Sequence, residues 1–233
     1  MSRGLWLTRI LDFISPRHCV VCSRRLAAAE GSVCSVCMLH MPRTTYQFTP
    51  TDNPMAQLFW HLVPVERAAA LVFYEPHSEM ARIVYALKYG DRPDIGEDMG
   101  RLMAEEMQLA RYLEGIDLLL PVPLSPRRKR QRGYNQCELL ARGISSKTSL
   151  PIASKAIGRR HFLKSQTRLS RQERQANVSN MFVLRDAAQL RGKHVLLVDD
   201  VCTTGATLTA CAEVLRSVEG IRISVLTFGF TKR

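Results

Sequence analysis

Residues 194–207, HVLLVDDVCTTGAT, constrain the fold more than any other stretch of this chain. An apolar run leads directly into two adjacent carboxylates, Asp199 and Asp200, and then into a short loop of small and hydroxylated residues. A wholly apolar run of this length is typical of a central strand that is covered on both faces in a parallel sheet. The acids and the loop then lie at the carboxyl end of that strand, where ligands collect in open α/β sheets.

Apolar runs of strand length alternate with helical patterns along most of the chain. The patterns predict strands at 68–75, 117–123, 155–159, 180–184, 194–200 and 221–230, and helices at 78–90, 95–113, 135–145 and about 205–218. Strands that alternate with helices predict an α/β domain with a mainly parallel, Rossmann-like sheet. We place this domain at 65–233, after a turn-rich linker at 47–64.

The hydroxyl-rich loop has the composition of an anion site. Unpaired backbone amides and the helix dipole favour a phosphate at the start of a helix, and threonine hydroxyls add donors. The predicted donors are Thr203, Thr204, Gly205, Ala206 and Thr207. The chain contains no GxxxxGK[ST] motif, which argues against a nucleoside-triphosphatase. Helix capping alone needs one such residue. A phosphate beside two carboxylates that accept hydrogen bonds from sugar hydroxyls fits a phosphorylated sugar.

Four of the seven cysteines are grouped near the N-terminus. Cys19 and Cys22 form one CxxC pair, and Cys34 and Cys37 form a second pair after eleven intervening residues. Two such pairs suit tetrahedral zinc, with disulfides or unrelated thiols as the alternative. We therefore predict a structural zinc module within residues 1–46. Cys137, Cys202 and Cys211 are isolated, and we expect them to be small buried residues.

The first sixteen residues resemble an amphipathic helix more than a signal peptide. Arg9 and Asp12 interrupt the apolar segment, so it has no continuous hydrophobic region. We expect this helix to pack on its own domain, with a membrane or partner contact as the alternative. No apolar run approaches the roughly 18 residues of a membrane span. These features predict a cytoplasmic protein without a transmembrane segment.

The net charge of +12 is concentrated in the middle of the chain. Residues 116–180 carry fourteen Lys and Arg against three Asp and Glu, whereas the preceding segment is acidic. A concentrated basic segment favours polyanions such as pyrophosphate or nucleic acid. The alternative is a solvated surface that only aids solubility.

The segment LLVDDVCTTGATL resembles the phosphoribosyl-pyrophosphate (PRPP) motif of type I phosphoribosyltransferases. The chain as a whole resembles the ComF/GntX family, in which a four-cysteine zinc module precedes a phosphoribosyltransferase-like domain. The segments ALKYGDR (86–92), LPVPLSPRRKRQRGYNQCELLA (120–141) and RLSRQERQANVSNMF (168–182) match the family in the same order. The resemblance implies a type I phosphoribosyltransferase-like fold.

The resemblance also implies roles for individual residues. Asp199 and Asp200 would face the ribose hydroxyls of PRPP, and residues 203–207 would hold its 5′-phosphate, with magnesium accompanying the ligand. Residues 160–177 would form a mobile loop that closes over the site. Candidates for binding pyrophosphate or nucleic acid are Arg127, Arg128, Lys129, Arg130, Arg132, Arg168, Arg171 and Arg174. Lys88 matches the family pattern without an assigned role.

Two functions remain open at this point. In the first, the chain is a PRPP-binding protein associated with DNA uptake and natural transformation. It would bind single-stranded DNA through the basic segment, with Tyr134 as a stacking residue, beside a helicase-like partner. Its location would be cytoplasmic or peripheral at the inner membrane face. In the second, it is an active phosphoribosyltransferase of nucleotide metabolism or salvage with an unidentified acceptor.

Overall fold

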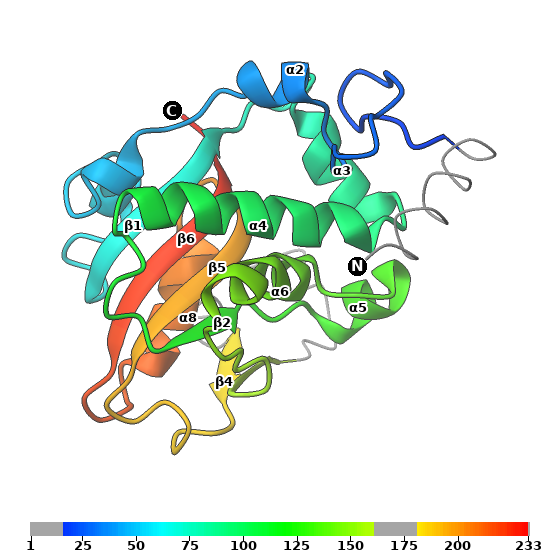
Figure 1. The fold of residues 1–233 in the computed structure, drawn as a ribbon. Coiled ribbons are helices and arrows are strands. Elements are labelled where there is room, and N and C mark those ends of the chain that lie inside the picture. The colour runs from blue at the N-terminus through cyan, green and yellow to red at the C-terminus, as the bar shows by residue number, and fades with distance from the viewer. Residues whose placement is uncertain (1–15, 161–180, 233) are drawn as a thin grey trace, which may run out of the picture.

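The computed structural model describes residues 16–160 and 181–232, and the chain is built around a parallel sheet (Figure 1). The four strands lie in the order β1-β6-β5-β2. Their bounds are β1 (Val65–Phe73), β2 (Leu118–Pro121), β5 (His194–Cys202) and β6 (Arg222–Phe230). Each neighbouring pair runs parallel, which confirms the predicted α/β class. β5 is central and almost entirely buried, as its apolar sequence predicts.

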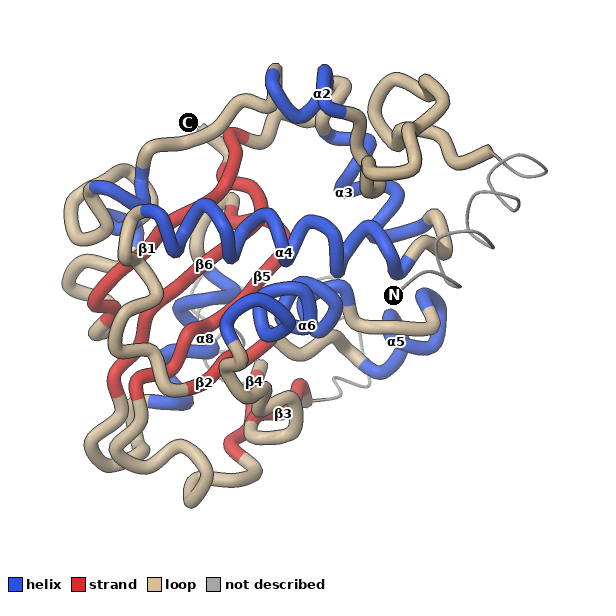
Figure 2. Tube along the Cα trace, in the orientation of Figure 1, coloured by secondary structure: helices blue, strands red, loops and turns tan. Residues whose placement is uncertain are grey.

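Helices cover both faces of the sheet (Figures 1 and 2). On one face lie α4 (Pro93–Leu109) and α6 (Gln136–Thr148), and on the other lies α8 (Ala206–Leu215). Pro93 begins α4 at a position where its missing amide costs nothing. The Asn135 side chain caps α6 by accepting from the Cys137 amide at 3.2 Å. The predicted helices are thus present, with ends that differ by a few residues.

Two smaller helices belong to the carboxyl end of the sheet and to the cysteine module. α3 (Ala81–Tyr89) follows β1 and ends at Gly90, as predicted, while α2 (Ser35–Leu39) carries Cys37. A separate antiparallel pair, β3 (Ile157–Arg159) and β4 (Phe182–Leu184), matches the two short strands predicted from sequence. The predicted mobile loop between them and the predicted N-terminal helix lie outside the described residues, except for Arg160 and Pro16 at their edges.

The basic segment after β2 forms a helix that the sequence patterns did not predict. α5 (Pro126–Arg132) begins at Ser125, whose hydroxyl accepts from the Arg128 amide, and it ends at Gly133 in the left-handed conformation. A serine cap, a proline in the first turn and a terminal glycine form a complete set of helix boundaries. The helix was not predicted despite these boundaries, because α5 buries no side chain and its sequence therefore shows no apolar periodicity.

Residues 47–64, which we expected to be a linker, pack against β1. Two short 3₁₀ helices, η1 (Tyr46–Phe48) and η2 (Ala56–Leu58), lie in or beside this segment. The Asn53 amide donates to the Thr49 and Ala68 carbonyls, both at 2.8 Å. Met55 and Phe59 are buried. Turn-forming residues therefore shape a packed connection here, while the proposed domain boundaries stay a prediction.

No helix within residues 16–160 and 181–232 is long and apolar enough to cross a membrane. The apolar material instead forms one continuous core between the sheet and its helices.

The α4–α6 contact depends on glycine at Gly100 and Gly143. A Cβ atom added at Gly143 would lie 2.2 Å from the Glu97 carbonyl oxygen and 2.7 Å from the Gly100 Cα atom. Real Cβ atoms do not approach backbone this closely, so the two helices touch through their main chains.

Replacement of Gly143 by alanine tests this contact. Alanine in a helix is ordinarily favoured over glycine by about 1 kcal/mol, but here overpacking should lower the free energy of unfolding by about 1–3 kcal/mol. Urea unfolding followed by circular dichroism measures the change. Arg142→Ala, at the exposed neighbouring position, is the control and should stay within about 0.5 kcal/mol of the wild type. A Gly143→Ala protein as stable as the control would contradict the close contact.

Candidate functional site

Asp199 and Asp200 lie within the paired part of β5 rather than beyond its end. The strand continues through both acids to Cys202, and the acids are only 7% and 6% exposed. One oxygen of Asp199, Oδ1, accepts from the Asp200 amide at 2.9 Å and from the Cys137 thiol at 3.1 Å. Burial, followed by the negative charge of Asp200, raises the pKa of Asp199 well above its ordinary value.

Asp200 has a different partner. Its Oδ2 atom lies 2.8 Å from Nζ of Lys88, which comes from the C-terminal turn of α3. Its Oδ1 atom accepts from the Val201 amide at 2.8 Å. Adjacent residues of a strand point to opposite faces, so the two acids meet partners from separate elements. The ammonium of Lys88 offsets one of two neighbouring buried charges, and this ion pair gives Lys88 the role that its sequence left open.

The loop after β5 leads directly into α8. Gly205 has a φ of +77°, a left-handed conformation that favours glycine. A Cβ atom there would lie 3.3 Å from Cβ of Leu58 and 3.4 Å from a ring carbon of Phe59. Thr203, Thr204 and Ala206 are exposed, and Thr207 is half-buried. A small hollow lies over this loop and includes Asp199 in its lining. The predicted phosphate loop and acid pair are therefore adjacent.

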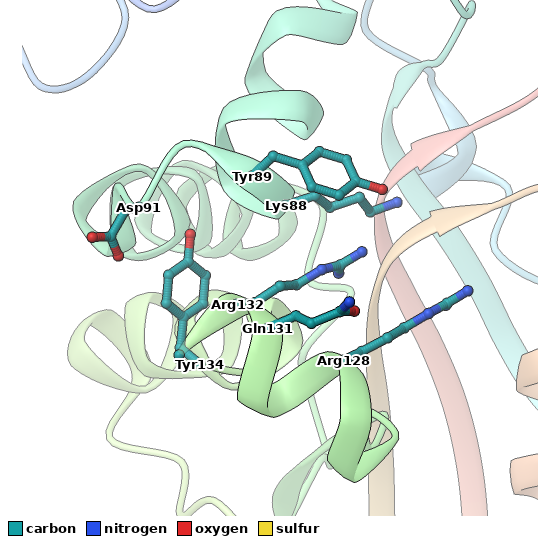
Figure 3. Close-up of a pocket in the computed structure, with 8 residues that line it drawn as sticks. Lys88, Tyr89, Asp91, Arg128, Gln131, Arg132 and Tyr134 are labelled. Atoms are coloured by element: carbon teal, nitrogen blue, oxygen red, sulfur yellow. The ribbon is translucent and has the colours of Figure 1, made fainter.

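A first pocket of about 690 Å³ opens between α3 and α5 (Figure 3). Its lining includes Lys88, Tyr89, Asp91, Arg128, Arg132 and Tyr134. The side chains of Lys88, Arg128 and Arg132 extend in the same direction, toward the ends of the strands (Figure 3). Because Lys88 also pairs with Asp200, this pocket adjoins the acid pair.

Two aromatic side chains of the first pocket are held in defined positions. The Arg132 guanidinium lies 5.2 Å from the centroid of the Tyr89 ring and donates to Oε1 of Gln136 at 2.9 Å. The Tyr134 hydroxyl donates to the Leu87 carbonyl at 2.9 Å. Both rings are therefore anchored by contacts between α3 and the α5–α6 segment.

A second pocket of about 670 Å³ lies between α5, the start of α6 and β3. Its lining contains five basic residues and one acid: Lys129, Arg130, Lys155, Arg159, Arg185 and Glu138. Arg159 lies 5.4 Å from the Phe182 ring centroid. The pKa of Arg159 lies below its ordinary value. Burial of the guanidinium is the main cause and the positive charge of Arg128 the second, while the negative charge of Asp199 opposes them. This pocket is thus basic, and it lies beside the start of α6, the helix whose Cys137 thiol bonds to Asp199.

The predicted basic residues separate into groups. Arg128 and Arg132 line the first pocket, Lys129 and Arg130 line the second, and Arg127 is exposed on α5 without lining either. Arg168, Arg171 and Arg174 lie outside the described residues.

Two residues at the candidate site were not predicted from the sequence. Arg159 lines the second pocket, and Cys137 is buried as expected but bonds to Asp199 across 62 positions of sequence. No local pattern marks either residue, because both reach the site only through the folding of the chain.

The four cysteines of the N-terminal module come together. Their four Sγ atoms all lie within 4.8 Å of one another; the residues are Cys19, Cys22, Cys34 and Cys37. The Cys34 amide donates to Sγ of Cys19 at 3.3 Å, and the Cys37 amide donates to Sγ of Cys34 at 3.5 Å. Hydrogen bonds, that from the Cys37 amide first, lower the pKa of Cys34 to about 7. Four converging sulfurs with amide donors fit a metal ion such as zinc.

The cysteine module is attached to the sheet domain through α3 and α4. The Ser32 amide donates to Oδ2 of Asp98 at 2.7 Å, and the Arg82 guanidinium donates to the Val21 carbonyl. Arg43 pairs with Glu106 at 2.8 Å. These contacts place the module beside α4 and α3, and α3 also lines the first pocket.

Comparisons with known proteins agree with this geometry. Residues 135–230 match the family model described as phosphoribosyl transferase domain. DNA utilization protein YhgH of Escherichia coli O157:H7 is 30% identical over 210 residues, which cover 86% of this chain and 91% of that protein. Competence protein F of Haemophilus influenzae is 31% identical over 224 residues, covering 92% and 97%. Competence protein ComFC of Bacillus subtilis is 32% identical over 111 residues, covering 48% and 42%.

The first two of these relatives span nearly the full length of the chain, and the matched domain contains the acid pair, the hydroxyl loop and α6. The parallel sheet and the four-cysteine cluster are the two parts that the sequence resemblance implies. The chain therefore belongs to the ComF/GntX family, with a type I phosphoribosyltransferase-like α/β fold beside an N-terminal four-cysteine cluster.

Proposed function

We propose that the chain binds PRPP at the junction of β5 and α8. The observation that carries this proposal is the buried acid pair that directly precedes an exposed hydroxyl loop at the start of a helix. The loop amides and threonines of residues 203–207 hold the 5′-phosphate, since a helix start favours an anion. Asp199 and Asp200 accept hydrogen bonds from the ribose hydroxyls.

The surrounding charges support this orientation. Two unpaired carboxylates would repel a phosphorylated sugar, but Lys88 offsets Asp200 at 2.8 Å. Arg128 and Arg132 of α5 share a pocket with Lys88, which supports a role for them in binding the pyrophosphate group. Magnesium bound with PRPP would supply further positive charge to the pyrophosphate, and carboxylate oxygens such as those of Asp199 and Asp200 suit this ion.

We also propose that the protein takes part in DNA uptake. Its relatives carry the names DNA utilization protein and Competence protein F, and α5 presents five exposed or half-exposed basic side chains. These side chains bind the phosphates of single-stranded DNA, with Tyr134 as a stacking residue. A helicase-like protein is the proposed partner, and peripheral association at the inner membrane face would accompany uptake.

Active phosphoribosyl transfer is the alternative. The observation that favours it is the 690 Å³ pocket, which adjoins the acid pair through Lys88 and offers space for an acceptor. A screen for pyrophosphate release from PRPP across bases and amines distinguishes transfer from binding alone.

The double variant Asp199→Asn, Asp200→Asn tests the PRPP site. We expect PRPP with magnesium to bind the wild type and the double variant to bind at least about tenfold more weakly, because the variant has no charged acceptors for the ribose hydroxyls. Isothermal titration calorimetry measures both affinities. Glu219→Gln is the control, since this carboxylate is 79% exposed and precedes β6 at the opposite end of the sheet. Equal PRPP affinity in all three proteins would rule out the acid pair as the ribose site.

Charge removal on α5 tests the DNA surface. We expect glutamine at Arg127, Arg128, Lys129, Arg130 and Arg132 to weaken single-stranded DNA binding. The salt dependence should also become shallower, by about 0.7 for each phosphate that the variant no longer neutralises. Fluorescence anisotropy with a dT oligonucleotide at several salt concentrations gives both quantities.

The matched control for this variant removes five exposed basic residues at the opposite end of the sheet. These are Arg111, Arg191, Lys193, Arg216 and Arg222. The control has the same net charge, so a specific surface on α5 predicts a larger effect from the α5 variant. An equal decrease of affinity and salt slope in both proteins would mean that DNA responds only to overall charge.

Metal analysis tests the cysteine cluster. We expect about one zinc per chain in protein purified without oxygen, because four thiolates complete a tetrahedral shell. Cys22→Ser should lose most of this zinc, and the exposed position of Cys22 limits any packing cost. Cys211→Ala, a change at a buried cysteine of α8, should keep its zinc. Well under one equivalent in the wild type would refute a zinc site.

A further inference from the structure

Glu30 lies in the loop between the two CxxC pairs, where its carboxylate gathers donors from separate parts of the module. Its Oε1 atom accepts from the Ser35 amide at 2.7 Å and from the Arg24 guanidinium at 2.9 Å. Its Oε2 atom accepts from the Ala27 amide at 2.8 Å. The side chain is only 14% exposed, so three hydrogen bonds hold a largely covered carboxylate in one place.

Two of these donors lie in opposite halves of the four-cysteine cluster. The Arg24 carbonyl accepts from the Cys19 amide at 2.8 Å, which makes Arg24 part of the turn around the first cysteine pair. Ser35 directly follows Cys34 and begins α2, the helix of the second pair. The Glu30 carboxylate therefore bridges the two pairs.

Glu30 is not itself one of the converging metal-ligating residues. Within residues 16–160 and 181–232, the four cysteine sulfurs form the group of ligand atoms that could hold a metal ion, and four thiolates complete a tetrahedral shell. Both Glu30 oxygens already accept from backbone amides or the guanidinium. Glu30 can therefore affect a metal only through the positions and surroundings of the cysteines.

Arg24 provides a second connection between Glu30 and the sulfurs. Its guanidinium interacts with the Cys34 sulfur as well as with Glu30, and the charge of Cys22 also acts on it. Four thiolates around a divalent ion leave an excess of negative charge, which a neighbouring guanidinium offsets. Because the Arg24 side chain is 49% exposed, its ion pair with Glu30 is what holds the guanidinium beside the sulfurs.

We propose that Glu30 is a positioning residue of the metal site. Its carboxylate holds the two cysteine pairs at the separation that a four-sulfur shell requires, and it directs Arg24 toward the sulfurs. The inference rests on a metal at the four cysteines. Residues that orient metal ligands without touching the metal contribute about 10- to 100-fold to metal affinity.

Zinc binding by variants of the full chain tests this role. We expect Glu30→Ala to bind zinc at least about tenfold more weakly than the wild type. Glu30→Gln should fall between them, because its amide oxygen keeps an acceptor but has no charge. Competition with a chromophoric chelator measures both the affinity and the rate of zinc release.

Co²⁺ substitution provides a readout that loop stability alone does not change. The visible absorption of Co²⁺ depends on its coordination geometry, so a displaced cysteine pair alters the bands. We expect the wild type to show the absorption of tetrahedral Co²⁺ with four sulfur ligands, and Glu30→Ala to show weaker and shifted bands at saturating Co²⁺.

Glu106→Ala is the matched control. Glu106 is a carboxylate of similar burial, 23% exposed, that pairs with an arginine of the same module, Arg43, at 2.8 Å. Arg43 lies after both cysteine pairs in the chain. The control therefore removes the same charge and one ion pair of the module, and its zinc affinity should stay within about threefold of the wild type.

Several outcomes would overturn the proposal. Equal zinc affinity in Glu30→Ala and Glu106→Ala would mean that Glu30 does not position the site. An unchanged Co²⁺ spectrum in a Glu30→Ala protein that binds zinc weakly would assign Glu30 to loop stability alone. A wild type that binds neither zinc nor Co²⁺ would end the metal proposal and this inference together, whereas normal binding by the wild type and by Glu30→Ala would end this inference only. Thermal unfolding checks that each variant is folded, and Glu30→Gln, of nearly the same size as the wild-type side chain, carries the comparison if Glu30→Ala is not.

Discussion

Burial of two adjacent carboxylates inside the central strand is the constraint on which the rest of the site depends. Removing an ionised carboxylate from water costs several kcal/mol unless partners replace its hydration. Asp200 meets this requirement with Lys88, and Asp199 meets it with the Asp200 amide and the Cys137 thiol. α3 and α6 must therefore reach the carboxyl end of β5, and their positions create the walls of the two pockets.

The helical conformation of the basic segment determines which pocket each of its side chains lines. A flexible turn would place its five cations without order, but α5 sends Arg128 and Arg132 to one side and Lys129 and Arg130 to the other. Residues four apart lie on the same helical face, whereas neighbouring residues diverge. The short helix thus divides one charged run between two pockets of different chemistry, the first of which adjoins the acid pair through Lys88.

The sheet, the acid pair and the cysteine cluster were predictable because each has a local pattern. Apolar run length identified β5, and CxxC spacing identified the cluster. α5 was not predicted because an exposed helix has no apolar periodicity. The packing of residues 47–64 was not predicted because it depends on the hydrogen bond from Asn53 to the carbonyl of Ala68, 15 residues away. The roles of Lys88, Cys137 and Arg159 depend on tertiary proximity, which no single-sequence pattern encodes. The residues in the PRPP site remain predictions.

The cysteine cluster and the acid pair are connected through α3. Near its start, α3 contacts the cluster through Arg82, which donates to the Val21 carbonyl between two of the cysteines. Near its end it contacts the acid pair through Lys88. Arg82 and Lys88 lie within roughly two turns of one another on this helix of nine residues. The four-cysteine module and the acid pair therefore contact opposite ends of the same helix.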